Sequence, residues 1–117
     1  MAEKKYQWHL LAGSIENIEW QENQLALVEV AGKKLTLVRF KDQVTACAHK
    51  CPHSGGLLAD GFVDAIGNVV CPLHRYRFNT QNGRNTSGEG YFLTTYPIET
   101  RENGLFIGIP EAGFLNW

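Results

Sequence analysis

Two short segments, each with one cysteine and one histidine, constrain this chain more than any other feature. The first is Cys51-Pro52-His53 and the second is Cys71-Pro72-Leu73-His74, with 17 residues between His53 and Cys71. Each cysteine is followed by a proline, and Gly55-Gly56 comes soon after the first segment. Thiolate and imidazole groups at this spacing predict a metal centre. The fold must therefore bring these two segments together.

Two kinds of metal centre use two cysteines and two histidines. A mixed-ligand [2Fe–2S] cluster has two thiolates on one iron and two imidazoles on the other, which fits one cysteine and one histidine per segment. Zinc also accepts four such ligands, in a tetrahedron. Zinc motifs, however, usually pair like with like and often occur in chains too small to fold otherwise. The mixed segments therefore favour the cluster, with a zinc-stabilised binding module or a redox sensor as the alternative.

The pattern C-x-H, 17 residues, then C-x-x-H resembles the Rieske family, and the resemblance extends over about residues 43–109. It implies one [2Fe–2S] cluster, with Cys51 and Cys71 on one iron and His53 and His74 on the other. It also implies an all-β fold, a Rieske-type antiparallel β-sandwich with an inserted cluster-binding hairpin and two ligand loops.

Three features of the high-potential Rieske proteins are missing from this chain. Those proteins have a further cysteine in each ligand loop, which form a disulfide, where this chain has Gly56 and Leu73. They also have a serine and a tyrosine that donate hydrogen bonds to the cluster and a ligand, where this chain has Tyr76 and Phe78. The chain is therefore similar to the low-potential ferredoxins of ring-hydroxylating dioxygenases, or to nitrite reductase small subunits. It departs from many of those ferredoxins because residues 79–90 contain no proline.

Turn residues divide the chain into short apolar segments, which predict strands. The expected strands are 6–12, 25–30, 34–40, 44–47, 62–66, 69–71, 91–100 and 105–109. Hairpin turns are expected at Ala31-Gly32-Lys33, Gly67-Asn68 and Asn103-Gly104. Segment 15–23 fits either a loop or a helical turn. Because helical periodicity is almost absent, we expect an all-β sandwich or barrel in a single domain, residues 1–117.

The composition is that of an ordinary soluble protein, with 44% hydrophobic and 20% charged residues. The net charge of −1 gives no general case for binding nucleic acid or an anionic membrane. Residues 1–9 lack the apolar run of a signal peptide, and no segment is long enough to span a membrane. We therefore expect a cytoplasmic protein, isolated as a monomer.

An electron carrier fits these observations better than an enzyme. A cluster with four protein ligands has no open coordination position, and the sequence contains no nucleotide-binding fingerprint and no room for a mononuclear iron domain. The resemblance implies transfer of single electrons from a reductase to a terminal oxygenase, or a fixed place as an accessory subunit of a nitrite-reductase-like enzyme. Basic residues near the ligands fit either a solvated basic rim or a docking surface for an acidic redox partner: Lys50, Arg75, Arg77 and Arg84.

Three further candidate ligands are assigned structural roles. Cys47 lies four residues before Cys51, in a segment that resembles a strand, so we expect a buried thiol that does not bind iron. His9 and His49 stand outside the two-segment pattern, and we expect them to be structural.

Overall fold

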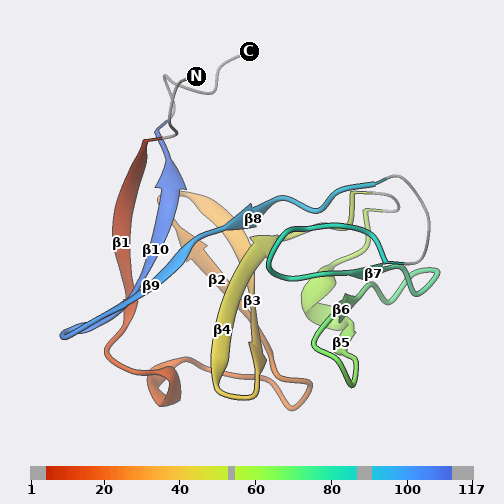
Figure 1. Cartoon of the computed structure of the whole chain (residues 1–117), viewed down its shortest axis with the longest axis horizontal. Helices are drawn as coiled ribbons and strands as arrows, with labels where there is room; N and C mark the ends of the chain where they lie inside the picture. The colour runs from red at the N-terminus through yellow and green to blue at the C-terminus, as the bar shows by residue number, and fades with distance from the viewer. Residues whose placement is uncertain (1–4, 53–54, 87–90, 112–117) are drawn as a thin grey trace.

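The computed structural model describes residues 5–52, 55–86 and 91–111, which form three antiparallel sheets (Figure 1). The first sheet has the order β1-β10-β9, with bounds β1 (Tyr6–Ala12), β9 (Ile98–Arg101) and β10 (Gly104–Pro110). The second has the order β2-β3-β4-β8, with bounds β2 (Leu25–Val30), β3 (Lys33–Phe40), β4 (Gln43–Ala48) and β8 (Thr95–Tyr96). The third has the order β5-β6-β7, with bounds β5 (Phe62–Val63), β6 (Val69–Val70) and β7 (Arg77–Phe78).

The described helices are two short 3-10 helices, η1 (Ile15–Asn17) and η2 (Leu58–Asp60). No helix within the described ranges is long and apolar enough to cross a membrane.

The β2–β3 hairpin shows how local sequence sets the register. Its turn consists of Ala31 and Gly32, both left-handed, with φ of 52° and 78°. Two positive φ angles are what a two-residue type I′ turn requires. The strands then pair from Val30 with Lys33 to Leu25 with Val38.

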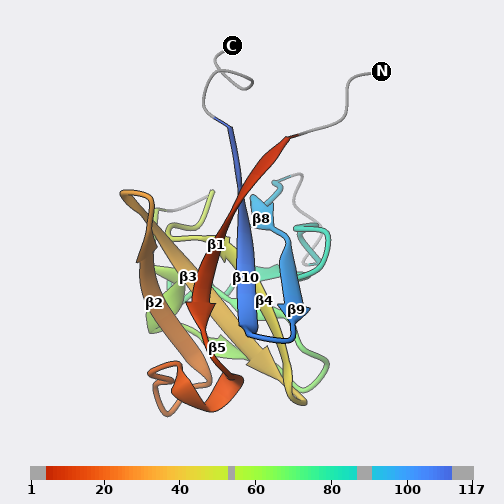
Figure 2. The same cartoon turned by 90° about the vertical axis from the view of Figure 1, so that its left-hand side faces the viewer.

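One hydrophobic core lies between the first two sheets, which cross face to face in Figure 2. Strands of both sheets contribute to it, because alternate residues of each strand point to the same side. Its buried members are Ile18, Ala26, Val30, Leu35, Leu37, Ala46, Leu105, Ile107 and Ile109.

A second core lies between the other side of the four-stranded sheet and the lobe that contains β5, β6 and β7. All three cysteines are in this core, and the others are aliphatic or aromatic: Leu25, Val38, Leu58, Val69, Phe78 and Leu93. The candidate ligand loops therefore begin inside a packed apolar region.

The all-β prediction is confirmed, and the strands at 6–12 and 25–30 begin and end where expected. The single strand expected at 91–100 is wrong. Pro97 has no N–H to donate and separates β8 from β9, although its carbonyl still accepts from the Gly108 N–H at 3.0 Å. Segment 15–23 contains only the short η1 helix.

The predicted hairpin between the ligand loops exists but is shorter than expected. Its strands pair only from Phe62 with Val70 to Val63 with Val69. The two-residue strand β7 was not predicted, because two residues carry no readable alternation; it pairs with β6 through Val69 and Phe78. This third strand brings the second ligand loop back against the core.

Candidate metal centre

Two of the four predicted ligands lie in the second core. Cys51 follows β4 and is 3% exposed, while Cys71 follows β6 directly and is fully buried. His74 is exposed. His53 lies outside the described residues.

The first ligand loop is closed by its own backbone. The Cys51 N–H donates to the Gly56 carbonyl at 2.8 Å, and the Gly55 N–H donates to the Cys51 carbonyl at 2.9 Å. Gly55 has a φ of 74°, a left-handed conformation that glycine adopts with little strain. At the base of the loop, the Leu58 N–H donates to the His49 carbonyl at 3.1 Å. These bonds fix the position of Cys51 relative to β4.

The second ligand loop is a tight turn that exposes its histidine. The Cys71 N–H donates to the Tyr76 carbonyl at 2.8 Å, which closes the turn around the residues between them. His74 and Arg75 are both left-handed, with φ of 65° and 57°. Two successive non-glycine residues in this region are strained, and such strain is concentrated at functional sites. The turn leaves the Cys71 side chain in the core and the imidazole of His74 outside it.

Gly56 is the point where the two loops touch. A Cβ atom at this position would lie 3.1 Å from Sγ of Cys71 and 3.1 Å from Cγ of Leu73. A side chain here would therefore press on a candidate ligand of the other loop. Gly56 and Leu73 are the positions that carry the disulfide cysteines in high-potential Rieske proteins, and here they face each other without a thiol.

Within the described ranges, no three cysteine, histidine, aspartate or glutamate side chains gather around one point. A two-iron cluster divides its four ligands between two metal ions, so convergence of three donors on one point is not required. Two buried thiols on contacting loops, with an exposed imidazole on one of them, fit this divided arrangement.

Hydrogen bonds from the segment before β2 hold η2 and Gly61, which follow the first ligand loop. Nδ2 of Asn23 donates to the carbonyls of Ala59 at 2.9 Å and of Gly61 at 3.0 Å. Nε2 of Gln21 donates to the same Ala59 carbonyl at 2.8 Å. Sequence reasoning missed these contacts, because nothing local indicates that an amide should reach a carbonyl 36 residues away.

The turn between β5 and β6 is organised by Asp64. Its Oδ1 accepts from the N–H groups of Ile66 at 3.0 Å and Asn68 at 2.9 Å, and its Oδ2 accepts from Nδ2 of Asn68 at 3.0 Å. Nε of Arg77 lies 3.8 Å from the same Oδ2. Burial alone would raise the pKa of Asp64, but the Asn68 and Ile66 hydrogen bonds and the charge of Arg77 outweigh it and lower the pKa.

We expect Asp64 to stabilise the fold in a pH-dependent way. A carboxyl whose pKa is lower in the folded chain contributes stability above its unfolded pKa, about 3.9, and loses it as the pH falls through the folded value. Asp64→Asn should lower the free energy of unfolding by about 1–2 kcal/mol at neutral pH, and by progressively less below about pH 4. Urea denaturation at several pH values measures this. The control is Asp42→Asn, which removes an exposed carboxylate paired with Arg39. If Asp64→Asn lowered the free energy of unfolding by the same amount at every pH, the stabilisation would not come from the carboxylate of Asp64.

We expected structural roles for three further candidates, and the structure gives their positions. Cys47 is fully buried in β4, and burial raises the pKa of its thiol to about 12. A thiol with so high a pKa supplies no thiolate at neutral pH. His49 is partly buried, and its main chain closes the base of the first loop. His9 lies in β1, in the sheet that is not part of the lobe.

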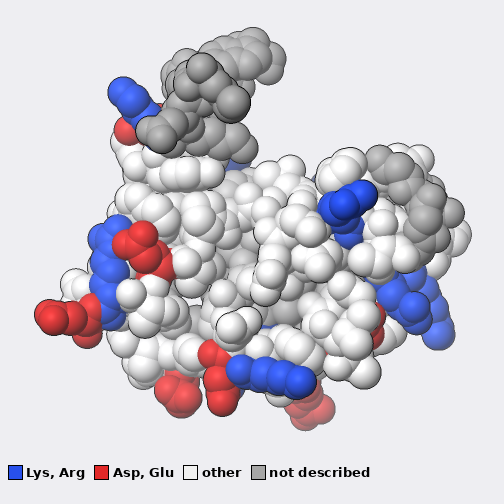
Figure 3. Space-filling model, viewed as in Figure 1, with Lys and Arg blue, Asp and Glu red and all other residues white. Residues whose placement is uncertain are grey.

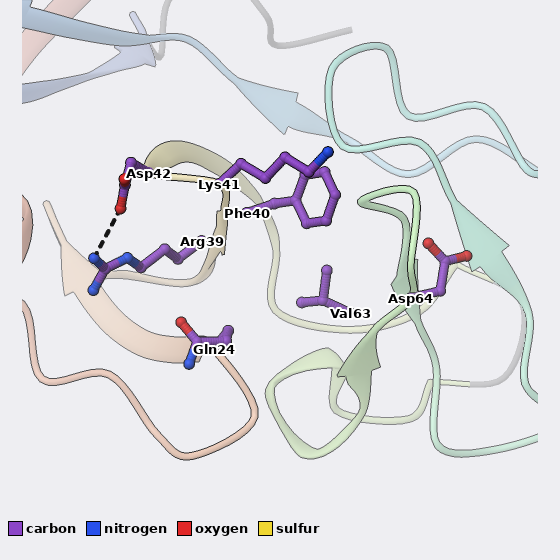
Figure 4. A pocket seen from close by; sticks show the side chains of 7 residues that line it. All are labelled: Gln24, Arg39, Phe40, Lys41, Asp42, Val63 and Asp64. Carbon is purple, nitrogen blue, oxygen red and sulfur yellow. Dashed lines mark hydrogen bonds and ion pairs between the residues drawn. The ribbon is translucent and has the colours of Figure 1, made fainter.

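A groove on the side of β3 and β5 is separate from the ligand loops (Figure 4). Charges of both signs line it, with Arg39 and Asp42 bonded at 3.1 Å and Asp64 directed toward β7. Asp64 also lies beside Arg77, and the ammonium of Lys41 lies 5.3 Å from the centre of the Phe40 ring.

The surface around the ligand loops carries positive charge. In Figure 3, lysine and arginine side chains lie at the upper and right sides of the lobe, while most acidic side chains in this view lie below or to the left of it. Lys50, Arg75 and Arg84 are exposed as predicted. Arg77 differs, because the carboxylate of Asp64 lies beside its guanidinium. The basic surface is therefore weaker at Arg77 than the sequence suggested.

The chain belongs to the Rieske family: the model of the Rieske [2Fe-2S] domain matches residues 8–96. The predicted family is confirmed, and the match begins well before the region expected from the sequence. The strands that carry the ligand loops are therefore part of the family's domain as well. Membership favours a [2Fe–2S] cluster over zinc.

Similar proteins of known role are ferredoxins of dioxygenase systems. The chain is 28% identical over 92 residues to the ferredoxin component of the naphthalene 1,2-dioxygenase system of Pseudomonas aeruginosa, covering 78% of this chain and 88% of that protein. It is 31% identical over 79 residues to the 3-phenylpropionate/cinnamic acid dioxygenase ferredoxin subunit of Escherichia coli (strain K12), covering 67% and 74%. Both relatives are named as ferredoxins, which agrees with the prediction of an electron carrier rather than an enzyme.

Solved structures share the fold. The ferredoxin of carbazole 1,9a-dioxygenase from Nocardioides aromaticivorans has a TM-score of 0.73 at 22% identity, covering 89% of this chain and 98% of that chain. A chain from Mycobacterium tuberculosis described as an NADH-dependent nitrite reductase small subunit has a TM-score of 0.73 at 21% identity, covering 89% and 96%. The two kinds of relative expected from the sequence thus share this architecture.

Proposed function

We propose that this protein is an electron carrier whose [2Fe–2S] cluster is held by Cys51 and Cys71 on one iron and by His53 and His74 on the other. One observation carries the proposal: two loops far apart in sequence meet at Gly56, with both thiols inside the core and His74 outside. The cluster supplies one-electron chemistry when it is bound.

The two kinds of ligand have different tasks. The two loops would hold the thiolates of Cys51 and Cys71 away from water, since both side chains are buried among apolar neighbours. The turn at His74 presents its imidazole at the surface, and this exposed group would be where an electron leaves for a partner. Because imidazoles bring no negative charge, His53 and His74 would hold the iron that takes up an electron more readily.

The proposed partners are a reductase that supplies electrons and a terminal ring-hydroxylating oxygenase that receives them. Support comes from the relatives named as ferredoxins of dioxygenase systems. We propose one domain over residues 1–117, in a monomer located in the cytoplasm. The second candidate, a subunit of a nitrite-reductase-like enzyme, is supported by the shared fold of the Mycobacterium tuberculosis chain. Copurification separates them, since a shuttle is isolated alone and a subunit with its enzyme.

Purified protein should be red-brown, with a reduced-state EPR spectrum of low average g. Its reduction potential should be about −150 mV, at the low end of the Rieske range, because no disulfide joins positions 56 and 73 and Phe78 has no hydroxyl. Elemental analysis, EPR and a redox titration measure these properties. A colourless, zinc-containing protein would exclude the carrier function. A reduction potential above roughly +100 mV would refute the argument that the missing disulfide and hydroxyl keep the potential low.

We expect electron transfer to the partner to slow as salt rises. Exposed basic groups act over about one Debye length, about 10 Å at roughly 0.1 M salt, and chiefly increase the association rate. Lys50→Glu/Arg75→Glu should slow transfer at low ionic strength without changing the visible spectrum. The control is Lys41→Glu, also exposed but at the opposite end of β4 from the first ligand loop. Equal rates in all three proteins would mean that the basic surface does not steer docking.

A further inference from the structure

Segment 91–94 is fixed against the second ligand loop. Leu93 is 3% exposed and belongs to the core that contains Cys51 and Cys71. Its N–H donates to the Gly83 carbonyl at 2.8 Å, and the Thr94 carbonyl accepts from the Ala48 N–H at 2.9 Å. Figure 1 shows this segment extending from β8 along the lobe. These hydrogen bonds therefore hold the backbone that follows Tyr91 in place.

Three rings form a row from this segment to the candidate ligand. The ring of Tyr91 stacks on that of Tyr76, with centroids 6.4 Å apart and planes at 28°. The ring of Tyr76 lies 6.4 Å from that of His74, with planes at 50°. Both separations lie within the range of attractive aromatic pairs. The middle ring is the least exposed of the three, since Tyr76 is half-buried whereas His74 is exposed and Tyr91 is 43% exposed.

His74 needs support from such a neighbour. It stands at the tip of the turn, is exposed, and has a left-handed backbone that costs conformational energy. Tyr76 closes this turn through its carbonyl, which accepts from the Cys71 N–H, and places its ring beside the imidazole. One residue thus acts on both candidate ligands of the second loop.

We propose that Tyr76 and Tyr91 are positioning residues for the metal centre. Their stacked rings hold the imidazole of His74 in its ligating orientation. The inference rests on the proposed function, because it assigns His74 a ligand role. It also explains why segment 91–94 is anchored beside the second ligand loop.

The test compares holoproteins of wild type, Tyr76→Leu, Tyr91→Leu and their Phe counterparts, which keep the rings. Two properties are measured: the rate of cluster loss to a chelator, followed by visible absorbance, and the EPR spectrum of the reduced protein. Each Leu variant should lose the cluster about twofold to tenfold faster, as expected from the strength of one aromatic pair, with a broadened or shifted EPR spectrum. The Phe variants should match wild type in both properties.

A neighbouring aromatic serves as matched control. Phe92 is 63% exposed, so Phe92→Leu removes a ring of the same kind from the same segment and should change neither property. If Tyr76→Leu fails to fold, the more exposed Tyr91→Leu decides alone. Wild-type rates and spectra in the Leu variants, or an equal effect of Phe92→Leu, would overturn the inference while leaving the carrier function intact. A wild-type protein without a [2Fe–2S] cluster would overturn both.

Discussion

Replacing Cys51 or Cys71 by serine should abolish the visible and EPR spectra of the cluster, whereas Cys47→Ser should leave both unchanged. All three cysteines are buried in the same core, so burial does not distinguish them. Position does: Cys51 and Cys71 lie on the two loops that meet at Gly56, while Cys47 lies within β4.

The histidine ligands extend this expectation. His74→Ala should abolish the Rieske-type EPR spectrum, since one iron loses an imidazole, and we expect the same of His53→Ala. His49→Ala is the matched control, because His49 lies two residues before Cys51 but outside the ligand pattern. Spectra and iron content of the purified variants are the measurements. A colourless Cys47→Ser protein, or one that keeps its spectra after Cys71→Ser, would show that the thiols are wrongly assigned.

Gly61→Ala should severely destabilise the lobe that carries the ligand loops. A Cβ at this position would lie 1.9 Å from the carbonyl oxygen of Val70, a backbone atom of β6 that cannot rotate away. The strands would have to separate where Phe62 pairs with Val70, just before Cys71. We expect a loss of more than about 3 kcal/mol in the free energy of unfolding, which belongs to the severe class of point mutations. Urea denaturation and cluster content after expression measure it.

Gly32→Ala is the control for this prediction. It adds the same methyl group to a glycine with no heavy atom within 4 Å, at a φ of 78°. Its cost should therefore be only the left-handed strain of alanine, about 1–2 kcal/mol. If the two variants are equally stable, the close approach of residue 61 to β6 is not a constraint in solution.

The sequence by itself determined the class of the protein. Metal ligands are a matter of residue type and spacing, so the segments at Cys51 and Cys71 predicted the family, which the match to the Rieske domain confirms. Strands such as β1 and β2 could be predicted because alternating apolar residues between turn residues are a local signal. The ligand assignment itself remains a proposal, with His53 outside the described residues.

Only the tertiary structure decided how the loops are held together. The contact at Gly56, the amide of Asn23 on the Ala59 carbonyl and the ring of Tyr91 on Tyr76 all join residues that are distant in the chain. The two-residue strand β7 likewise depends on pairing with β6. Such contacts leave no pattern in the local sequence, because the local backbone conformation of a residue does not specify which distant residue it will contact. Close packing of particular side chains then selects the partner.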